Sequence, residues 1–87
     1  MKATYQGGIV RGRKYTFGIV QVEAEVINNK EEAIKTVQAL LPLFDGMPVV
    51  LVSEEEGEKP NYFARPDLMK FLMDFHLPSV AWKEYTL

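Results

Sequence analysis

An unbroken apolar run, Val49-Val50-Leu51-Val52, constrains the fold of this chain more than any other feature. A strand with one face in water alternates apolar and polar residues, whereas this run is apolar throughout and β-branched at all positions but Leu51. Such a composition is typical of the centre of a sheet covered on both faces. The run therefore predicts a buried central strand, for which the rest of the chain supplies neighbours and cover.

The segment just before this strand carries the signals of one complete helix. Asn29 and Glu32 form a capping pair, in which the amide accepts a hydrogen bond from an early backbone N–H of the helix. We predict a helix from Lys30 to about Leu41, because Pro42 lacks the backbone donor that continuation needs. The apolar residues of the segment recur at three- and four-residue spacing: Ala33, Ile34, Val37, Leu40, Leu41 and Phe44.

The N-terminal part has the pattern of a two-stranded hairpin. The first strand covers about residues 3–10, the turn falls at Gly12-Arg13, and the second strand runs from about Lys14 to Ile27. Within the second strand the apolar positions change from odd to even numbers at Ile19-Val20. We expect either a β-bulge near Gly18 or a strand whose two halves are covered on opposite sides.

The C-terminal part predicts a loop, a helix and a strand. The loop from Ser53 to Ala64 is long and acidic. A second helix begins at Arg65-Pro66-Asp67, with proline in the first turn, and Pro78 closes it. Residues 79–87 then form a last strand. The core stripe of the second helix contains Leu68, Phe71, Leu72 and Phe75.

These elements define one domain over residues 1–87, of the α/β class with α+β possible. The order is β-β-α-β-α-β, an antiparallel hairpin joined to a βαβαβ unit in a mixed four-stranded sheet. Right-handed crossovers in a sheet that grows in one direction place both helices on the same face. The alternative is a reversal of strand order, which places one helix on each face.

A sheet with both helices on one face leaves the other face bare and apolar, and soluble monomers rarely leave such a patch uncovered. We therefore predict a small protein-interaction module or accessory subunit, most simply a homodimer, without catalytic activity. Met69 and Met73 lie one step round the second helix from its core stripe and widen the contact surface, although core packing explains most of this stripe. The predicted interface residues are Tyr5, Ile9, Tyr15, Phe17, Met69 and Met73.

Several classes of function are disfavoured by composition. The chain has no cysteine and one histidine, so it offers no thiolate nucleophile and a dedicated transition-metal site is not expected. Neither a phosphate-binding loop nor a dinucleotide fingerprint is present, so we predict no cofactor. No apolar run has the length of a membrane helix, and the start of the chain lacks the apolar core of a signal peptide, which predicts a cytoplasmic protein without membrane contact.

The charges are divided along the chain. The residues before Glu23 contain four basic side chains and no acid, so that in a chain of net charge −2 the remainder carries −6. Arg11, Arg13 and Lys14 gather at the hairpin turn beside aromatic residues, a combination that can neutralise phosphates while rings stack on bases. Nucleic-acid or other polyanion binding through this hairpin is therefore the alternative function.

Candidates for chemistry are few. The acidic segment from Glu54 to Glu58 follows the buried strand, at the edge where open α/β sheets bind ligands, and its carboxylates can hold Mg²⁺ or Ca²⁺. An unbroken acidic run is more often a solvated loop, so we assign no metal site. His76, near the end of the second helix, favours a capping or exposed role. A carboxylate-based or metal-assisted enzyme is the second alternative, with no catalytic residue assigned.

Overall fold

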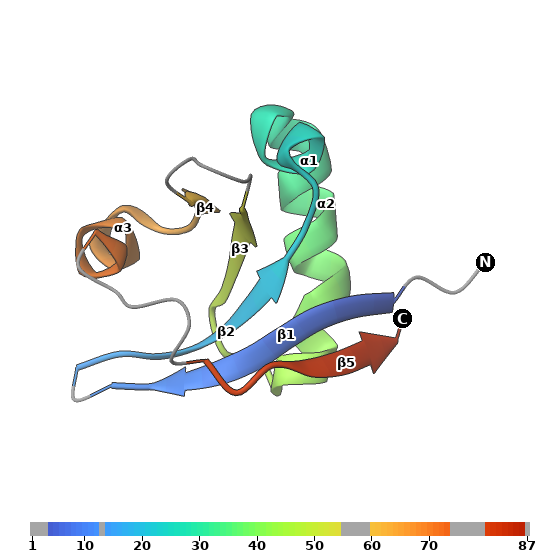
Figure 1. Cartoon of the computed structure of the whole chain (residues 1–87). Helices are drawn as coiled ribbons and strands as arrows, with labels where there is room; N and C mark the ends of the chain where they lie inside the picture. Colours follow the sequence, from blue (N-terminus) through green and yellow to red (C-terminus); the bar gives the residue numbers. More distant parts are fainter. Residues whose placement is uncertain (1–3, 13, 55–59, 74–79, 87) are drawn as a thin grey trace.

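The computed structural model describes residues 4–12, 14–54, 60–73 and 80–86. Its centre is a five-stranded mixed sheet with the strand order β4-β3-β2-β1-β5, accompanied by helices on either side (Figure 1). The strands are β1 (Thr4–Arg11), β2 (Thr16–Gln21), β3 (Val49–Ser53), β4 (Asn61–Phe63) and β5 (Lys83–Thr86). The helices are α1 (Ala24–Asn28), α2 (Lys30–Leu40), the 3₁₀ turn η1 (Leu41–Phe44) and α3 (Pro66–Leu72).

The sheet confirms the predicted fold class and its mixed topology. β1 and β2 form the antiparallel hairpin, and β3 lies parallel to β2 and adjacent to it. β3 is buried at every position, as the apolar run predicts. The fifth strand, β4, was not predicted: it is a three-residue edge strand antiparallel to β3, within the segment expected to be a loop.

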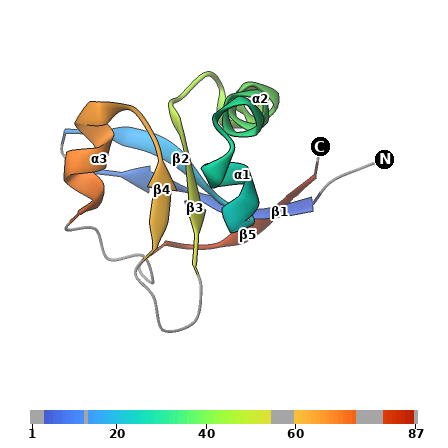
Figure 2. The same ribbon diagram turned by 90° about the horizontal axis from the view of Figure 1, so that it is seen from above.

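The prediction that both helices lie on one face is wrong. One buried cluster joins Phe17 and Ile19 of β2 to Leu68 of α3, and a second joins Val20 of β2 to Leu40 of α2. Alternate residues of a strand point to opposite faces, so α2 and α3 cover opposite faces of the sheet, as the two views show (Figures 1 and 2). The strand order accompanies this arrangement: the chain moves from β2 to β3 and β4 in one direction, then crosses back over the sheet to place β5 beside β1. The segment that contains α2 joins the parallel neighbours β2 and β3, whereas the segment that contains α3 joins β4 at one edge of the sheet to β5 at the other.

This two-sided cover also explains the change of apolar phase in β2. Phe17 and Ile19 face α3, whereas Val20 faces the side of α1 and α2. The register of β1 with β2 is continuous from Gly7↔Val20 to Arg11↔Thr16, so there is no bulge near Gly18. The strand also ends six residues earlier than predicted, at Gln21, because the next segment forms the short helix α1.

The helix signals in the sequence are confirmed where the structure describes them. Asn29 caps α2 through its side-chain oxygen, which accepts a hydrogen bond from the backbone N–H of Glu32 at 3.3 Å. Asp45 and Gly46 end η1 in the left-handed region, at φ of 52° and 80°. Pro66 begins α3 after Arg65 in an extended conformation. The predicted continuation of this helix through Phe75 and His76 lies outside the described residues.

Two aromatic rings define the packing on the α2 side of the sheet. Phe44 of η1 lies over Gly18 of β2 and, at 4.9 Å between ring centroids, against Tyr85 of β5. Tyr85 in turn lies over Gly7 of β1, where a Cβ atom would sit 3.2 Å from its ring carbons. The two glycines therefore provide the space in which the two aromatic rings pack on the sheet.

None of the helices in the described part of the chain is long and apolar enough to cross a membrane.

Candidate functional site

The residues predicted to form an apolar sheet interface do not share one surface. Phe17 is fully buried beneath α3, so the bare face on which the dimer prediction rested is absent. Tyr15 is half-buried, with its ring centroid 5.7 Å from that of Phe71. Tyr5 is half-buried on the opposite face, against the cluster that α2 covers.

The other three predicted interface residues are exposed. Met73 is 84% exposed, Met69 is 38% exposed and Ile9 is 36% exposed. Met69 and Met73 therefore lie outside the core of α3, whose buried residues are Leu68 and Leu72. Ile9 lies on β1, where its register partner on β2 is Gly18.

The basic hairpin borders an open cleft beside α3, which we call the hairpin cleft. Its volume is about 600 Å³, and its lining residues are Lys14, Tyr15, Pro66, Asp67, Lys70 and Phe71. The Nζ atom of Lys14 lies 5.8 Å from the centroid of the Tyr15 ring, a cation–π distance. Arg11 is exposed at the end of β1, and Arg13 lies outside the described residues. Two ammonium groups and two aromatic rings thus line one cleft, together with the carboxylate of Asp67.

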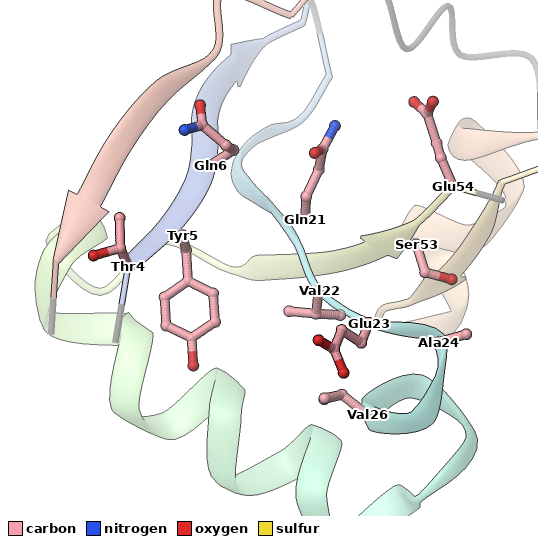
Figure 3. A pocket seen from close by; sticks show the side chains of 10 residues that line it. All are labelled: Thr4, Tyr5, Gln6, Gln21, Val22, Glu23, Ala24, Val26, Ser53 and Glu54. Carbon is pink, nitrogen blue, oxygen red and sulfur yellow. The ribbon is translucent and has the colours of Figure 1, made fainter. Parts of the chain in front are cut away.

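A second cleft lies at the other end of β1, and we call it the edge cleft (Figure 3). Its volume is about 570 Å³, within the range of small-ligand sites. The cleft exists because the strands part: β1 pairs with β2 only from Gly7 onward, whereas residues 4–6 pair with β5 alone. After Gln21 the chain turns toward β3, and the N–H of Val22 donates to the carbonyl of Val52 at 2.8 Å. The inner edge of residues 4–6 is therefore without a ladder partner among the described residues.

Polar side chains line the edge cleft on both sides of the sheet, next to the apolar side chains of Val22, Ala24 and Val26. Gln6, Gln21 and Glu54 project from one side, and Tyr5 and Glu23 project toward the helices (Figure 3). Among residues 4–12, 14–54, 60–73 and 80–86, no lysine, arginine or histidine lines this cleft; the lining residues are Thr4, Tyr5, Gln6, Gln21, Val22, Glu23, Ala24, Val26, Ser53 and Glu54. Two carboxylates and two amides next to an open strand edge suit a ligand that carries positive charge and hydrogen-bond donors.

Ser53 adds a buried polar group to the wall of this cleft. The residue is 3% exposed, and its hydroxyl has no hydrogen-bond partner in the part of the chain that the structure describes. A buried hydroxyl without a partner costs stability, and native proteins keep such groups rare.

Glu54 also affects the tyrosine of the neighbouring edge strand. Burial raises the pKa of Tyr62 above its ordinary value of 10.0, and the negative charge of Glu54 raises it further. Tyr62 and Val52 are register partners, which places the tyrosine beside the end of β3. The carboxylate of Glu54 and the phenol of Tyr62 therefore interact electrostatically at the carboxyl end of the central strand.

The acidic segment after β3 is described only at its start. Glu54 is exposed and lines the edge cleft, while the remainder, Glu55 to Glu58, lies outside the described residues, as does His76. Within residues 4–12, 14–54, 60–73 and 80–86, no three histidine, cysteine or acidic side chains lie together as metal ligands would.

Sequence reasoning placed Glu54 at a ligand-binding edge but missed Gln6, Gln21 and Glu23. The position of Gln21 at the end of an apolar strand was an available signal. Its proximity to Gln6 follows from the hairpin register, in which Gly7 is opposite Val20. The parting of the two strands, which opens the cleft, has no signal in the residue pattern.

Fold and site together define a small α+β domain with two open clefts of different charge. Comparisons with protein-family models, with curated proteins and with solved structures found no match.

Proposed function

We propose that this protein is a small protein-interaction module or accessory subunit whose edge cleft binds a basic, extended segment of a partner protein. The observation that carries the proposal is the lining of the cleft: among the described residues it has two carboxylates, two amides and no cationic side chain, next to a strand edge that none of them pairs with. The lack of cysteine fits a reducing compartment such as the cytoplasm.

The open edge supports binding through the backbone. An extended peptide can add to an exposed strand edge, where main-chain hydrogen bonds give affinity and side-chain contacts give specificity. Residues 4–6 offer only a short edge, so side-chain contacts must supply much of the selectivity. Glu23 and Glu54 are the groups able to select lysine or arginine over acidic residues.

Both carboxylates are exposed, which sets the expected strength of binding. Exposed ion pairs are each worth about 0–1 kcal/mol, and salt screens them. We therefore expect affinity in the micromolar range or weaker, with a clear loss as salt rises.

Fluorescence anisotropy with a labelled peptide of alternating lysine and valine tests this proposal, with the glutamate–valine peptide as its charge control. The Glu23→Gln/Glu54→Gln variant should lose most of the binding. The Glu31→Gln/Glu32→Gln variant removes the same charge from residues that do not line the cleft, and it should bind as the parent does. Equal binding of both peptides, or equal loss in both variants, would refute the proposal.

Polyanion binding through the hairpin is a second candidate, favoured by the two ammonium groups and two aromatic rings of the hairpin cleft. Changing Arg11, Arg13 and Lys14 to Ala should then abolish retention on single-stranded nucleic acid at low salt. Retention equal to that of the unchanged protein would exclude this candidate.

A further inference from the structure

We infer that the partner of the edge cleft is a second copy of this chain, which inserts the cationic tip of its β1–β2 hairpin. The inference rests on the proposed function of the edge cleft and names its occupant. It replaces dimerisation through a bare sheet face with a head-to-tail contact between two surfaces of opposite charge.

The charges of both surfaces have no ion-pair partner among the residues that the structure describes. Arg11 and Lys14 are exposed at the hairpin, and neither forms an ion pair with a described residue. Glu23 and Glu54 are likewise exposed at the edge cleft and without an ion pair among the described residues. The described ion pair joins Arg65 to Asp67, with Nε and Oδ1 3.4 Å apart, and involves neither surface charge set.

These charges cannot meet within one molecule. β1 runs from the edge cleft at Thr4 to the hairpin at Arg11 (Figure 1). At a rise of about 3.3 Å per residue, its ends are separated by roughly 23 Å. That separation exceeds about 10 Å, the Debye length at 0.1 M salt, so attraction across it is largely screened. Close pairing of the two charge sets therefore requires a second chain.

The size of the edge cleft is also compatible with this occupant. Its volume of about 570 Å³ lies in the range of sites that enclose small ligands, which is enough for long side chains such as those of Arg11 and Lys14. Since the edge cleft and the hairpin are different surfaces, the contact is heterologous, and each molecule keeps one free end after it binds.

The test uses two variants that each disable one half of the contact. Arg11→Gln/Lys14→Gln removes the charges of the hairpin and leaves the cleft intact, whereas Glu23→Gln/Glu54→Gln does the reverse. Lys30→Gln/Lys35→Gln is the matched control for loss of positive charge on exposed residues of α2. The masses are measured by sedimentation velocity at about 0.05 M and about 1 M salt, over a range of protein concentrations.

We expect the unchanged protein and the control to associate at low salt and to dissociate at high salt. Each hairpin or cleft variant alone should associate at least about tenfold more weakly. An equimolar mixture of these two variants should restore association as a 1:1 complex, because one intact hairpin then meets one intact cleft. A monomeric parent protein at all concentrations, or a mixture no larger than its components, would overturn the inference.

This experiment separates failure of the inference from failure of the proposed function. If the parent protein stays monomeric but the lysine–valine peptide still binds in a Glu23- and Glu54-dependent manner, the cleft has a different partner and only the inference fails. If the monomeric protein instead binds single-stranded nucleic acid through Arg11 and Lys14, the hairpin serves that ligand and the self-association is refuted.

Discussion

Gly18→Ala tests most directly how closely the α2 side of the sheet is packed. Gly18 lies in β2 beneath the ring of Phe44, which is buried in the cluster covered by α2. A Cβ atom at this position would lie 2.4, 2.7 and 2.8 Å from three ring atoms of Phe44, closer than van der Waals contact permits. The ring is fully enclosed, so relief requires movement of η1 or of β2.

The expected magnitude follows from two opposing effects. Overpacking a filled core by one methyl group costs about 1–3 kcal/mol. Replacing glycine by alanine in strand geometry restricts the unfolded chain and returns about 0.4–1 kcal/mol. The clash is the larger effect, so we expect a net loss of about 1–2 kcal/mol in the free energy of unfolding. For a domain of this size such a loss lowers Tm by about 5–15 °C.

Urea unfolding followed by circular dichroism measures this loss, and a double-mutant cycle assigns its cause. Phe44→Leu shortens the side chain that causes the clash, so the two substitutions together should cost less than the sum of their separate effects, by about 0.5–3 kcal/mol. Additive effects, or a Gly18→Ala variant as stable as the parent, would refute the packing of Phe44 on Gly18.

Three further predictions concern α3, Tyr62 and the cap of α2. Met73→Glu should change the free energy of unfolding by no more than about 0.5 kcal/mol, because the side chain of Met73 is exposed. Leu68→Ala should cost about 2–5 kcal/mol, because Leu68 is buried. Similar losses for the two variants in urea melts would contradict the assigned core. Glu54→Gln should lower the pKa of Tyr62 but leave it above 10.0, since burial is the larger cause of the shift. The free energy of unfolding should fall as pH rises past 10.0, because Tyr62 ionises first in the unfolded chain. Ultraviolet titration of the tyrosine checks this, and a titration midpoint unchanged by Glu54→Gln would contradict it. Asn29→Ala should cost about 0.5–2 kcal/mol and Asn29→Asp much less, because the aspartate oxygen also accepts from the helix; equal losses in thermal melts would exclude the cap.

The two-sided cover of the sheet changes how the exposed residues are interpreted. The sequence argument for a homodimer required an apolar face without helices, and α3 supplies that cover. The surface also carries a split of charge between the hairpin and the edge cleft, and this split does not depend on a bare sheet face. Self-association is therefore proposed through electrostatic complementarity, and its dependence on salt is a property that a contact between apolar faces would not share.

Local signals in the sequence were enough to determine several elements. The cap at Asn29, the stop at Asp45-Gly46 and the start of α3 at Pro66 depend on backbone hydrogen bonds and φ preferences of neighbouring residues. The buried β3 and its parallel pairing with β2 followed from an apolar run reached through a helix. These features involve residues close in sequence, or the handful of connections that a short crossover permits.

Tertiary structure alone decided the strand order, the cover of each face and the edge cleft. The position of β5 beside β1 is a pairing between the two ends of the chain, and no local pattern fixes it. With β5 in that position, α3 lies on the face opposite α2 and covers Phe17. Phe17 is therefore in the core, although the sequence pattern also allowed it to lie at a dimer interface. The parting of β1 and β2 brings Gln6, Gln21 and Glu54 to one cleft. The sequence thus determined which segments bury apolar surface. Long-range pairing determined which polar groups came together, because a polar side chain can face water at many places on the surface and its residue type does not select one of them.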